Sequence, residues 1–366
     1  SEVYRNAIEQ VEFADRIGLD YVVLAEHHFS SYGMLPNPLV MIPALAARAP
    51  RVRFSTAVVV LPLHNPMQLA EEIAMVDHLT GGRLDVGFGT GYQEYEFQRF
   101  QKPLAENRAI FEETLEVLQK ALTQAPFSHD GHYYRIPETT TLPRPLQTPH
   151  PPVWIPGSNS TETLYQVARR EFCYFLSTRG KLSGAKRSAL RFGEVVEEVG
   201  KTYHPRSMGL LFSVYVAEND EIARKESEEA VFYFTKYCLK GHQRRKGRRL
   251  TMAPGGLSPK SWQLYLENSD PTAKMLGDAE SWQDIDDMGS IFVGGPDTVF
   301  QKLWEFVSEA NIGNLLIQFH IGNLSKEKTL KSQRIFSETV LPRLRAESEK
   351  LFARKFPLNI QVKEPA

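Results

Sequence analysis

Short apolar runs that alternate with helical stretches constrain the fold of this chain more than any other feature. Tyr21–Leu24 and Val52–Val60 are compact, β-branched runs typical of buried parallel strands. Each follows a stretch whose apolar residues have helical spacing, and the first of these, from about Glu2 to Ile17, ends at Gly18. Because parallel strands need a helical crossover, the pattern predicts repeated helix–strand units around a parallel sheet.

The alternation continues along the chain. Further strands are predicted at 83–87, 153–155, 174–176, 210–216 and 315–319. Further helices are predicted at 38–49, 67–79, 111–122, 161–169, 188–199, 221–237, 299–310 and 326–345. We expect an α/β fold, a (β/α)8 TIM barrel in a single domain spanning 1–366, with its first strand absent from the sequence. A doubly wound open sheet is the alternative.

Two stretches interrupt this rhythm and are predicted to be insertions, near 124–151 and 240–288. The first has a hairpin pattern, with strands at Phe127 and His132–Arg135, followed by a proline-rich run. The second is rich in charge, Gly and Pro and begins with basic residues at 240, 244–246 and 248–249. It is either a solvated surface loop or an anion-binding lid over the site.

Composition narrows the possible partners and the compartment. The 366 residues include 43 basic and 44 acidic side chains, and a formal net charge of -1 argues against nucleic acid or a membrane surface as partner. Cys173 and Cys238 are the only cysteines, so we expect neither a disulfide framework nor a thiolate metal site, and a reducing cytoplasm fits best. No signal peptide or bilayer-spanning run is evident.

Three ionisable residues, Glu26, His27 and His28, follow the first predicted strand directly. They are badly placed for packing but well placed for chemistry, because α/β barrels and open sheets carry their sites beyond the C-terminal ends of strands. A polar loop with a capping histidine is the other interpretation. His64, which follows the strand at 52–60, is either a second site residue or a surface-loop histidine.

Glycines follow the strand at 83–87, in the order Gly87-Phe88-Gly89-Thr90-Gly91. A dinucleotide-binding fingerprint would need a helix at once and a later acidic residue, and a polar, aromatic stretch follows instead. We therefore reject that interpretation. The alternative is a wall where a flat ring presses against bare backbone.

A third cluster, Gly157-Ser158-Asn159-Ser160, joins the strand at 153–155 to the helix at 161–169. Hydroxyl and amide side chains at a helix start are typical of N-caps, and a helix N-terminus binds phosphate without any lysine. Plain capping would need only one of them, so a run of them favours phosphate binding.

In combination and in this order, these motifs resemble the bacterial luciferase-like flavin-dependent monooxygenases. The resemblance rests on Glu26-His27-His28-Phe29, Pro36-Asn37-Pro38, Leu61-Pro62 with Asn65-Pro66, Leu79–Arg83, the Gly157 cluster and the tail at 312–319 and 340–344. It covers nearly the whole chain except the two insertions and the absent first strand.

The resemblance implies a two-component enzyme. Reduced FMN, supplied by a separate flavin reductase, would bind at the barrel mouth, form a C4a-peroxyflavin with O2 and oxygenate a small, mostly apolar organic substrate. By position, His27 is the expected catalytic residue. The expected cofactor-binding residues are Glu26, Ala57, Val58, Gly89, Thr90, Gly91, Gly157, Ser158, Asn159 and Ser160, with a non-prolyl cis peptide at Ala57–Val58.

Two positions depart from the luciferase pattern. Luciferase has a reactive cysteine where Gly89 stands and a phosphate-binding arginine where Thr90 stands. These departures argue against bioluminescence and leave the phosphate without an assured cationic partner. An F420-dependent hydride-transfer oxidoreductase on the same fold, or a non-catalytic flavin-binding partner subunit, is an alternative function.

The sequence also bears on assembly and substrate. The predicted helix from Pro38 is apolar nearly all round, so we expect a second molecule to cover it, in a homodimer. Aromatic residues near the predicted site fit an apolar substrate or the core; they are Phe29, Tyr32, Phe88, Tyr92 and Tyr95.

Overall fold

The computed structural model describes residues 2–30, 33–157, 160–177, 182–239, 244–245, 248–249 and 276–355. Two compact units are distinguished by their internal contacts. The first comprises residues 1–163 and 240–273, and the second comprises residues 164–239 and 274–366. Every predicted site residue belongs to the first unit.

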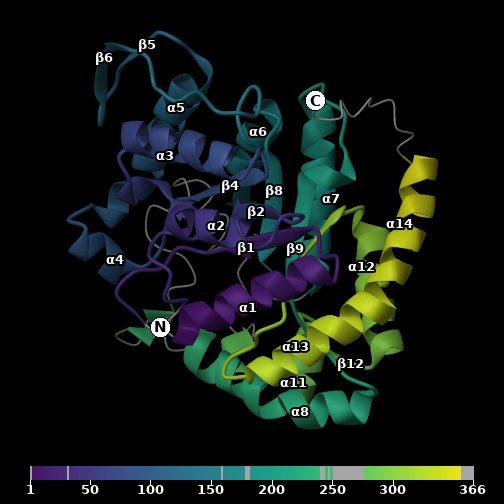
Figure 1. The fold of residues 1–366 in the computed structure, drawn as a ribbon. Helices are drawn as coiled ribbons and strands as arrows, with labels where there is room; N and C mark the ends of the chain where they lie inside the picture. The colour runs from purple at the N-terminus through teal and green to yellow at the C-terminus, as the bar shows by residue number, and fades with distance from the viewer. Residues whose placement is uncertain are drawn as a thin grey trace. The chain divides into compact units, whose positions relative to one another are not determined.

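Helices and strands of the first unit alternate as predicted (Figure 1). Its helices are α1 (Glu2–Arg16), α2 (Pro38–Ala46), α3 (Pro66–Leu79), α4 (Glu94–Arg99), α5 (Asn107–Thr123) and the start of α6 (Thr161–Arg169), with 3-10 turns η1 (Leu61–Leu63) and η2 (Leu104–Glu106). Its strands are β1 (Tyr21–Leu24), β2 (Arg53–Thr56), β3 (Val59–Val60), β4 (Leu84–Gly89), β5 (Phe127–Asp130), β6 (Arg135–Thr139) and β7 (Val153–Gly157).

The main strands of this unit pair in parallel in the order β1-β2-β4-β7, and β3 also pairs with β4. In register, Leu24 lies opposite Thr56, and Val60 lies opposite Gly89. The C-terminal ends of β1, β3 and β4 therefore lie at one edge of the sheet. The loops that follow these strands carry most of the predicted site.

Local sequence sets where the helices around this edge begin. Asn37 and Asn65 each precede a proline, and their side-chain oxygens accept hydrogen bonds from the backbone N–H groups of the first turns of α2 and α3. Asparagine at the N-cap with proline at the first helical position is a favoured helix start, because proline there gives up no hydrogen bond. Both helices therefore start at fixed points directly after the loops of the site.

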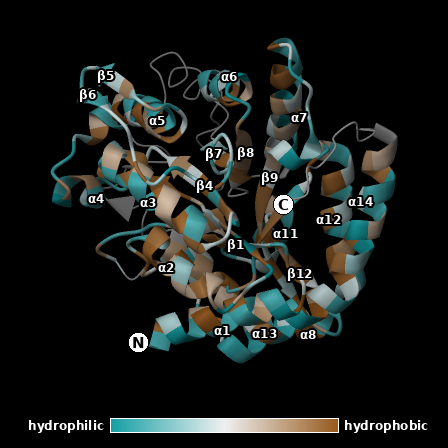
Figure 2. Cartoon of the chain, turned by 45° about the horizontal axis from the view of Figure 1, so that its top comes forward, coloured by the Kyte–Doolittle hydropathy of each residue, from teal (hydrophilic) through white to brown (hydrophobic). Residues whose placement is uncertain are grey.

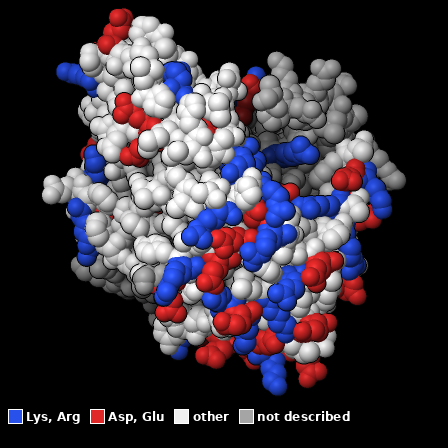
Figure 3. Space-filling model, in the orientation of Figure 1, with Lys and Arg blue, Asp and Glu red and all other residues white. Residues whose placement is uncertain are grey.

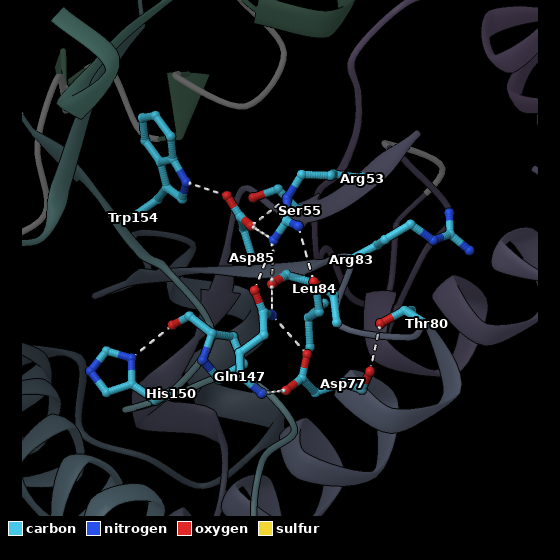
Figure 4. Close-up of polar contacts among 12 residues, drawn as sticks. Arg53, Ser55, Asp77, Thr80, Arg83, Leu84, Asp85, Gln147, His150 and Trp154 are labelled. Carbon is cyan, nitrogen blue, oxygen red and sulfur yellow. Dashed lines mark hydrogen bonds and ion pairs between the residues drawn. The ribbon is translucent and has the colours of Figure 1, made fainter. Parts of the chain in front are cut away.

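A network of polar side chains ties the strands of the first unit together at their N-terminal ends (Figure 4). Arg53 Nη2 donates to Asp85 Oδ1 at 2.6 Å, and Trp154 Nε1 donates to Asp85 Oδ2 at 3.0 Å. Gln147 Nε2 donates to Asp77 Oδ1 at 2.7 Å. Because β2, β4 and β7 all start here, the network fixes their register at the end opposite the predicted site.

In the second unit, strands again pair in parallel, with β8 and β13 on β9 and with β12 on the C-terminal part of β9. The strands are β8 (Cys173–Ser177), β9 (Met208–Val216), β12 (Ile291–Gly294) and β13 (Asn314–Gln318). The helices are the rest of α6, α7 (Leu182–Glu198), α8 (Asp220–Tyr233), α11 (Trp282–Met288), α12 (Pro296–Ala310), α13 (Lys326–Ile335) and α14 (Leu341–Lys355), with η3 (Pro205–Ser207), the π-helix η4 (Phe234–Leu239), η5 (Leu276–Asp278) and the π-helix η6 (Phe336–Val340).

The core of each unit lies between its strands and the helices that cover them. In Figure 2 the strands are largely hydrophobic, and the amphipathic helices turn their hydrophilic residues away from the strands. Phe54 and Phe88 are fully buried in the first unit, and Phe212 and Phe292 stack in the second with ring centroids 5.0 Å apart. None of the helices in the described ranges is both long enough and apolar enough to cross a bilayer.

Several predicted boundaries were wrong. The strand predicted over 52–60 is two strands, β2 and β3, separated at Ala57–Val58. The strand β12 was missed, because four apolar residues beside the charged insertion carry too weak a pattern. The second hairpin strand begins at Arg135 rather than His132, and η6 interrupts the helix predicted over 326–345. Of the insertion near 240–288, the structure describes the backbone of the two-residue strands β10 (Arg244–Arg245) and β11 (Arg248–Arg249) and then residues from Leu276 onward.

Candidate functional site

Glu26 lies at the C-terminal edge of the first unit's sheet, and both of its carboxylate oxygens are bonded. Its side chain has 0% exposure, and its Oε1 lies 2.7 Å from His28 Nε2. Both Glu26 oxygens lie 3.0 Å from His64 Nε2, and Oε2 accepts a hydrogen bond from the Val60 N–H at 3.0 Å. Because an ionised carboxylate only accepts hydrogen bonds, each of these Nε2 atoms carries a hydrogen. His64 is therefore a partly buried partner of the predicted site residue Glu26, and its role in the site stays a prediction.

These contacts lower the pKa of Glu26 and raise the pKa of His64. Burial alone would raise the pKa of Glu26, but hydrogen bonds from His28, His64 and Val60 together with the charge of His64 outweigh it and lower that pKa to about 2. Burial alone would lower the pKa of His64, but Glu26 and the more distant Glu72 raise it above its usual value. Glu26 is therefore a carboxylate at neutral pH, and its charge favours the imidazolium form of His64.

His27, the predicted catalytic residue, is oriented by a different carboxylate. Its Nδ1 lies 3.3 Å from Oε1 of Glu96, and the same oxygen accepts the His28 N–H at 2.9 Å. The His27 backbone N–H donates to the Leu35 carbonyl at 3.0 Å. A carboxylate at Nδ1 holds the proton there in the neutral ring, so Nε2 becomes the nitrogen that exchanges a proton. Sequence reasoning missed Glu96, whose signal was an acidic residue soon after the glycine segment.

The Ala57–Val58 peptide is cis, as the resemblance predicted. Three hydrogen bonds hold its surroundings: Ala57 N–H donates to the Leu24 carbonyl at 2.7 Å, and Glu26 N–H donates to the Val58 carbonyl at 3.2 Å. The third runs from Val60 N–H to the Glu26 carboxylate. Glu26 therefore contacts this segment on both sides of Val59.

The glycines of β4 leave room for the protein's own atoms. A Cβ on Gly87 would lie 2.1 Å from the Thr56 carbonyl oxygen, and one on Gly89 would lie 2.5 Å from Val58 Cγ2. Gly91 has a φ of +71°, and a Cβ there would lie 2.6 Å from a methyl carbon of β3. These close approaches explain the glycines without a ligand, so a flat ring against residues 89–91 stays a prediction.

Asn107, at the start of α5, holds the segment after β4. It is fully buried, and its Nδ2 donates to the carbonyl oxygens of Thr90 and Gly91 at 3.4 and 3.0 Å. Its Oδ1 and the Nε2 of buried Gln93 find no hydrogen-bond partner among the described residues. An acceptor and a donor thus remain available beside the predicted flavin-contacting segment. Nothing in the local sequence marks Asn107, and it was not predicted.

The predicted phosphate-binding cluster is described only in part. Gly157 ends β7, and Ser160 Oγ accepts the Thr163 N–H at 3.2 Å as the cap of α6. Ser158 and Asn159 lie outside the described residues. Capping is therefore established for Ser160, and phosphate binding by the cluster stays a prediction.

The aromatic residues near the site are not alike. Phe88 is 1% exposed and belongs to the core, whereas Phe29 and Tyr92 are 58% and 48% exposed. The Tyr92 ring makes an edge contact with His27, with centroids 6.2 Å apart. Tyr32 lies outside the described residues. Among the described side chains, no group of three or more His, Cys, Asp and Glu is arranged to hold a metal ion.

Comparison with known proteins decides the family. The model of the luciferase-like monooxygenase family matches residues 1–310. This chain belongs to that family. The luciferase-like family and the flavin-dependent monooxygenase class predicted from the motifs are therefore confirmed.

Two relatives are similar to this chain in sequence. The chain is 30% identical over 350 residues to uncharacterized protein y4vJ of Sinorhizobium fredii, covering 93% of this chain and 92% of that one. It is 31% identical over 237 residues to the oxygenase component of flavin-dependent trigonelline monooxygenase from Acinetobacter baylyi, covering 63% and 65% of the two chains.

Solved structures share the fold. The oxygenating constituent of 3,6-diketocamphane monooxygenase from Pseudomonas putida, in complex with FMN, matches with a TM-score of 0.74 at 21% identity over 93% of both chains. An F420-dependent secondary alcohol dehydrogenase matches with a TM-score of 0.68 at 17% identity, over 93% of this chain and 95% of that one. The predicted TIM-barrel fold is therefore confirmed.

One departure from the luciferase pattern has a structural reason. At Gly89, where luciferase carries a cysteine, the space for any side chain is filled by Val58. A luciferase-like chain with this arrangement of β3 and β4 accommodates only glycine at that position without movement. Thr90, the second departure, has its carbonyl held by Asn107.

Proposed function

We propose that this chain is the oxygenase component of a two-component system, which takes reduced FMN from a separate flavin reductase and uses O2 to oxygenate a small, mostly apolar organic substrate. The observation that carries the proposal is His27 held at Nδ1 by the buried Glu96 carboxylate, directly after Glu26, whose backbone N–H binds the Val58 carbonyl of the cis Ala57–Val58 segment. Relatives support it, because one is the oxygenase component of a flavin-dependent monooxygenase and a structural neighbour binds FMN.

The residues present fit a flavin. The cis Ala57–Val58 peptide would support the ring, and the segment Gly89–Gly91 would border it, with Gln93 Nε2 and Asn107 Oδ1 as buried donor and acceptor nearby. The N-terminus of α6, with residues 157–160, would hold the phosphate through backbone N–H groups. Bound reduced FMN supplies the electrons that activate O2.

In this proposal His27 holds or moves a proton at Nε2, next to the oxygen that reaches the substrate. Glu96 keeps the ring in one orientation and tautomer, as the acidic partner of a catalytic histidine commonly does. The half-buried setting of His27, whose side chain is 13% exposed, limits the access of water to that proton.

An F420-dependent hydride transfer is the second candidate, because F420-dependent enzymes are among the structural neighbours. A non-catalytic flavin-binding subunit is the third, since both alkanal monooxygenase alpha and beta chains are relatives. The F420-dependent enzyme would transfer hydride without O2. The non-catalytic subunit would bind flavin but would not turn over a substrate.

A stopped-flow experiment separates these functions. Reduced FMN bound to the protein is mixed with O2, and the return of oxidised FMN absorbance is timed against O2 consumption. A monooxygenase delays that return relative to free reduced FMN, and His27→Ala shortens the delay while FMN affinity is retained. A return as fast as that of free FMN would refute the proposed function, and unchanged behaviour of His27→Ala would remove His27 from the mechanism.

We also propose a homodimer, a cytoplasmic location and a single domain over 1–366. Val40 on α2 is 74% exposed, and Met75 and Leu79 on α3 are 51% and 59% exposed. Figure 3 shows a largely uncharged area over α2 and the adjoining part of α3. Exposed apolar side chains on two packed helices favour burial by a second copy. A monomeric mass in light scattering would contradict the dimer.

A further inference from the structure

Glu26 has no bonding capacity left for a ligand. One oxygen is bound by His28 and His64, and the other by His64 and the Val60 N–H. Its side chain has no exposed surface. The resemblance implied that Glu26 lines the flavin site. Because its carboxylate is fully occupied by the protein's own groups, we expect Glu26 to affect the flavin indirectly.

The contacts of Glu26 converge on one stretch of chain, residues 57–64, which we call the cis-peptide segment. The Glu26 backbone N–H binds the Val58 carbonyl, and its carboxylate binds the Val60 N–H. His64 lies at the C-terminal end of the segment, directly after the η1 turn, and its Nε2 binds the same carboxylate. Glu26 thus binds the segment at its start, its middle and its end.

We propose that Glu26 and His64 are a positioning pair, which fixes the cis-peptide segment for the flavin through one partly buried ion pair without touching the cofactor. The inference rests on the proposed function, because it assigns the flavin to that segment. His28 binds the same carboxylate at 2.7 Å but lies outside the segment.

The charges around His64 give the pair a pH dependence. Glu26 faces it directly from the loop after β1, and Glu72 acts on it from α3. His28 shares the Glu26 carboxylate, and Glu96 from α4 binds the His28 backbone. Glu26 and Glu72 favour the imidazolium form of His64 and raise its pKa. Loss of the His64 proton as the pH rises above that pKa breaks the ion pair and releases the end of the segment.

The test measures the dissociation constant of oxidised FMN by fluorescence quenching between pH 6 and pH 10. The variants are Glu26→Gln, His64→Gln, the double variant and the control His78→Gln. His78 is an α3 histidine bound to the Arg144 carbonyl, away from the pair. We expect each pair variant to weaken FMN binding about tenfold at pH 6, as for loss of one charged hydrogen bond. The double variant should weaken it no further, because both changes remove the same interaction.

Wild type and His78→Gln should lose affinity as the pH rises above the pKa of His64, and the pair variants should show no such loss. Weak binding in Glu26→Gln alone would mean that Glu26 contacts FMN directly, and would overturn the proposal. FMN binding that is unchanged in all variants would also overturn it while leaving the proposed function intact. Failure of wild type to bind either oxidised or reduced FMN would overturn both. If Glu26→Gln does not fold, His64→Gln and its pH profile decide alone.

Discussion

Replacing Gly87 by alanine tests the close approach of β2 and β4 beside the cis peptide. A Cβ at residue 87 would lie 2.1 Å from the Thr56 carbonyl oxygen and 3.1 Å from its carbon. The obstacle is backbone, which no rotation of a side chain can relieve. Thr56 Oγ1 also accepts the Gly87 N–H at 2.8 Å and donates to the Gly87 carbonyl at 2.9 Å, so separating the strands breaks these bonds too.

The expected cost follows from the two effects together. Overpacking costs about 1–3 kcal/mol, and each lost buried hydrogen bond adds about 1 kcal/mol. A loss of about 3 kcal/mol lowers the melting temperature of a unit of this size by roughly 6–12 °C. Gly89→Ala is the matched control, because its nearest atom, Val58 Cγ2, lies on a side chain that can rotate.

Thermal unfolding followed by circular dichroism measures both variants, with FMN affinity as a second readout. We expect Gly87→Ala to melt well below wild type and to bind FMN weakly. Gly89→Ala should melt within a few degrees of wild type, and Val58→Ala should relieve it further. If Gly87→Ala costs no more than Gly89→Ala, the described spacing of β2 and β4 is wrong.

Further predictions concern acid, the network of Figure 4 and the segment after β4. Folding lowers the pKa of Glu26 from 4.5 to about 2, so its ionisation contributes about 3 kcal/mol to the free energy of unfolding. This contribution is fully present above pH 4.5 and is lost as the pH falls to 2, and Glu26→Gln should flatten this part of an acid-unfolding curve. Asp85→Asn, which weakens the contact with Arg53 at the opposite end of the sheet, should lower the melting temperature and leave FMN affinity unchanged. Asn107→Ala removes the donor to the Gly91 carbonyl and should weaken FMN binding several-fold with a smaller effect on melting, measured by the same titration and melt; equal FMN affinity would contradict its role.

The sequence was sufficient for the order of the longer helices and of most strands, and for the loop that carries His27. Both depend on local pattern, namely apolar periodicity and ionisable residues after a buried strand. The cis peptide at Ala57–Val58 followed from family resemblance and not from the physics of the local sequence. The strand β12 has only four residues, too few for periodicity to distinguish it from a loop.

The partners in the site could not be predicted, because they are set by contacts between distant parts of the chain. Glu96 meets His27 across 69 positions, and His64 meets Glu26 across 38. The glycines of β4 misled in the opposite way. Their spacing suggested a surface for a ligand, whereas the backbone of Thr56 requires Gly87 and the Val58 side chain occupies the space at Gly89.

The location of FMN in a crystal of the complex tests the account most directly. We predict the isoalloxazine ring in van der Waals contact with the Ala57–Val58 peptide, the phosphate at residues 157–160, and the His27 imidazole facing the ring while Glu96 binds its Nδ1. A flavin bound elsewhere, or a Glu26 carboxylate in direct contact with the flavin, would contradict the account.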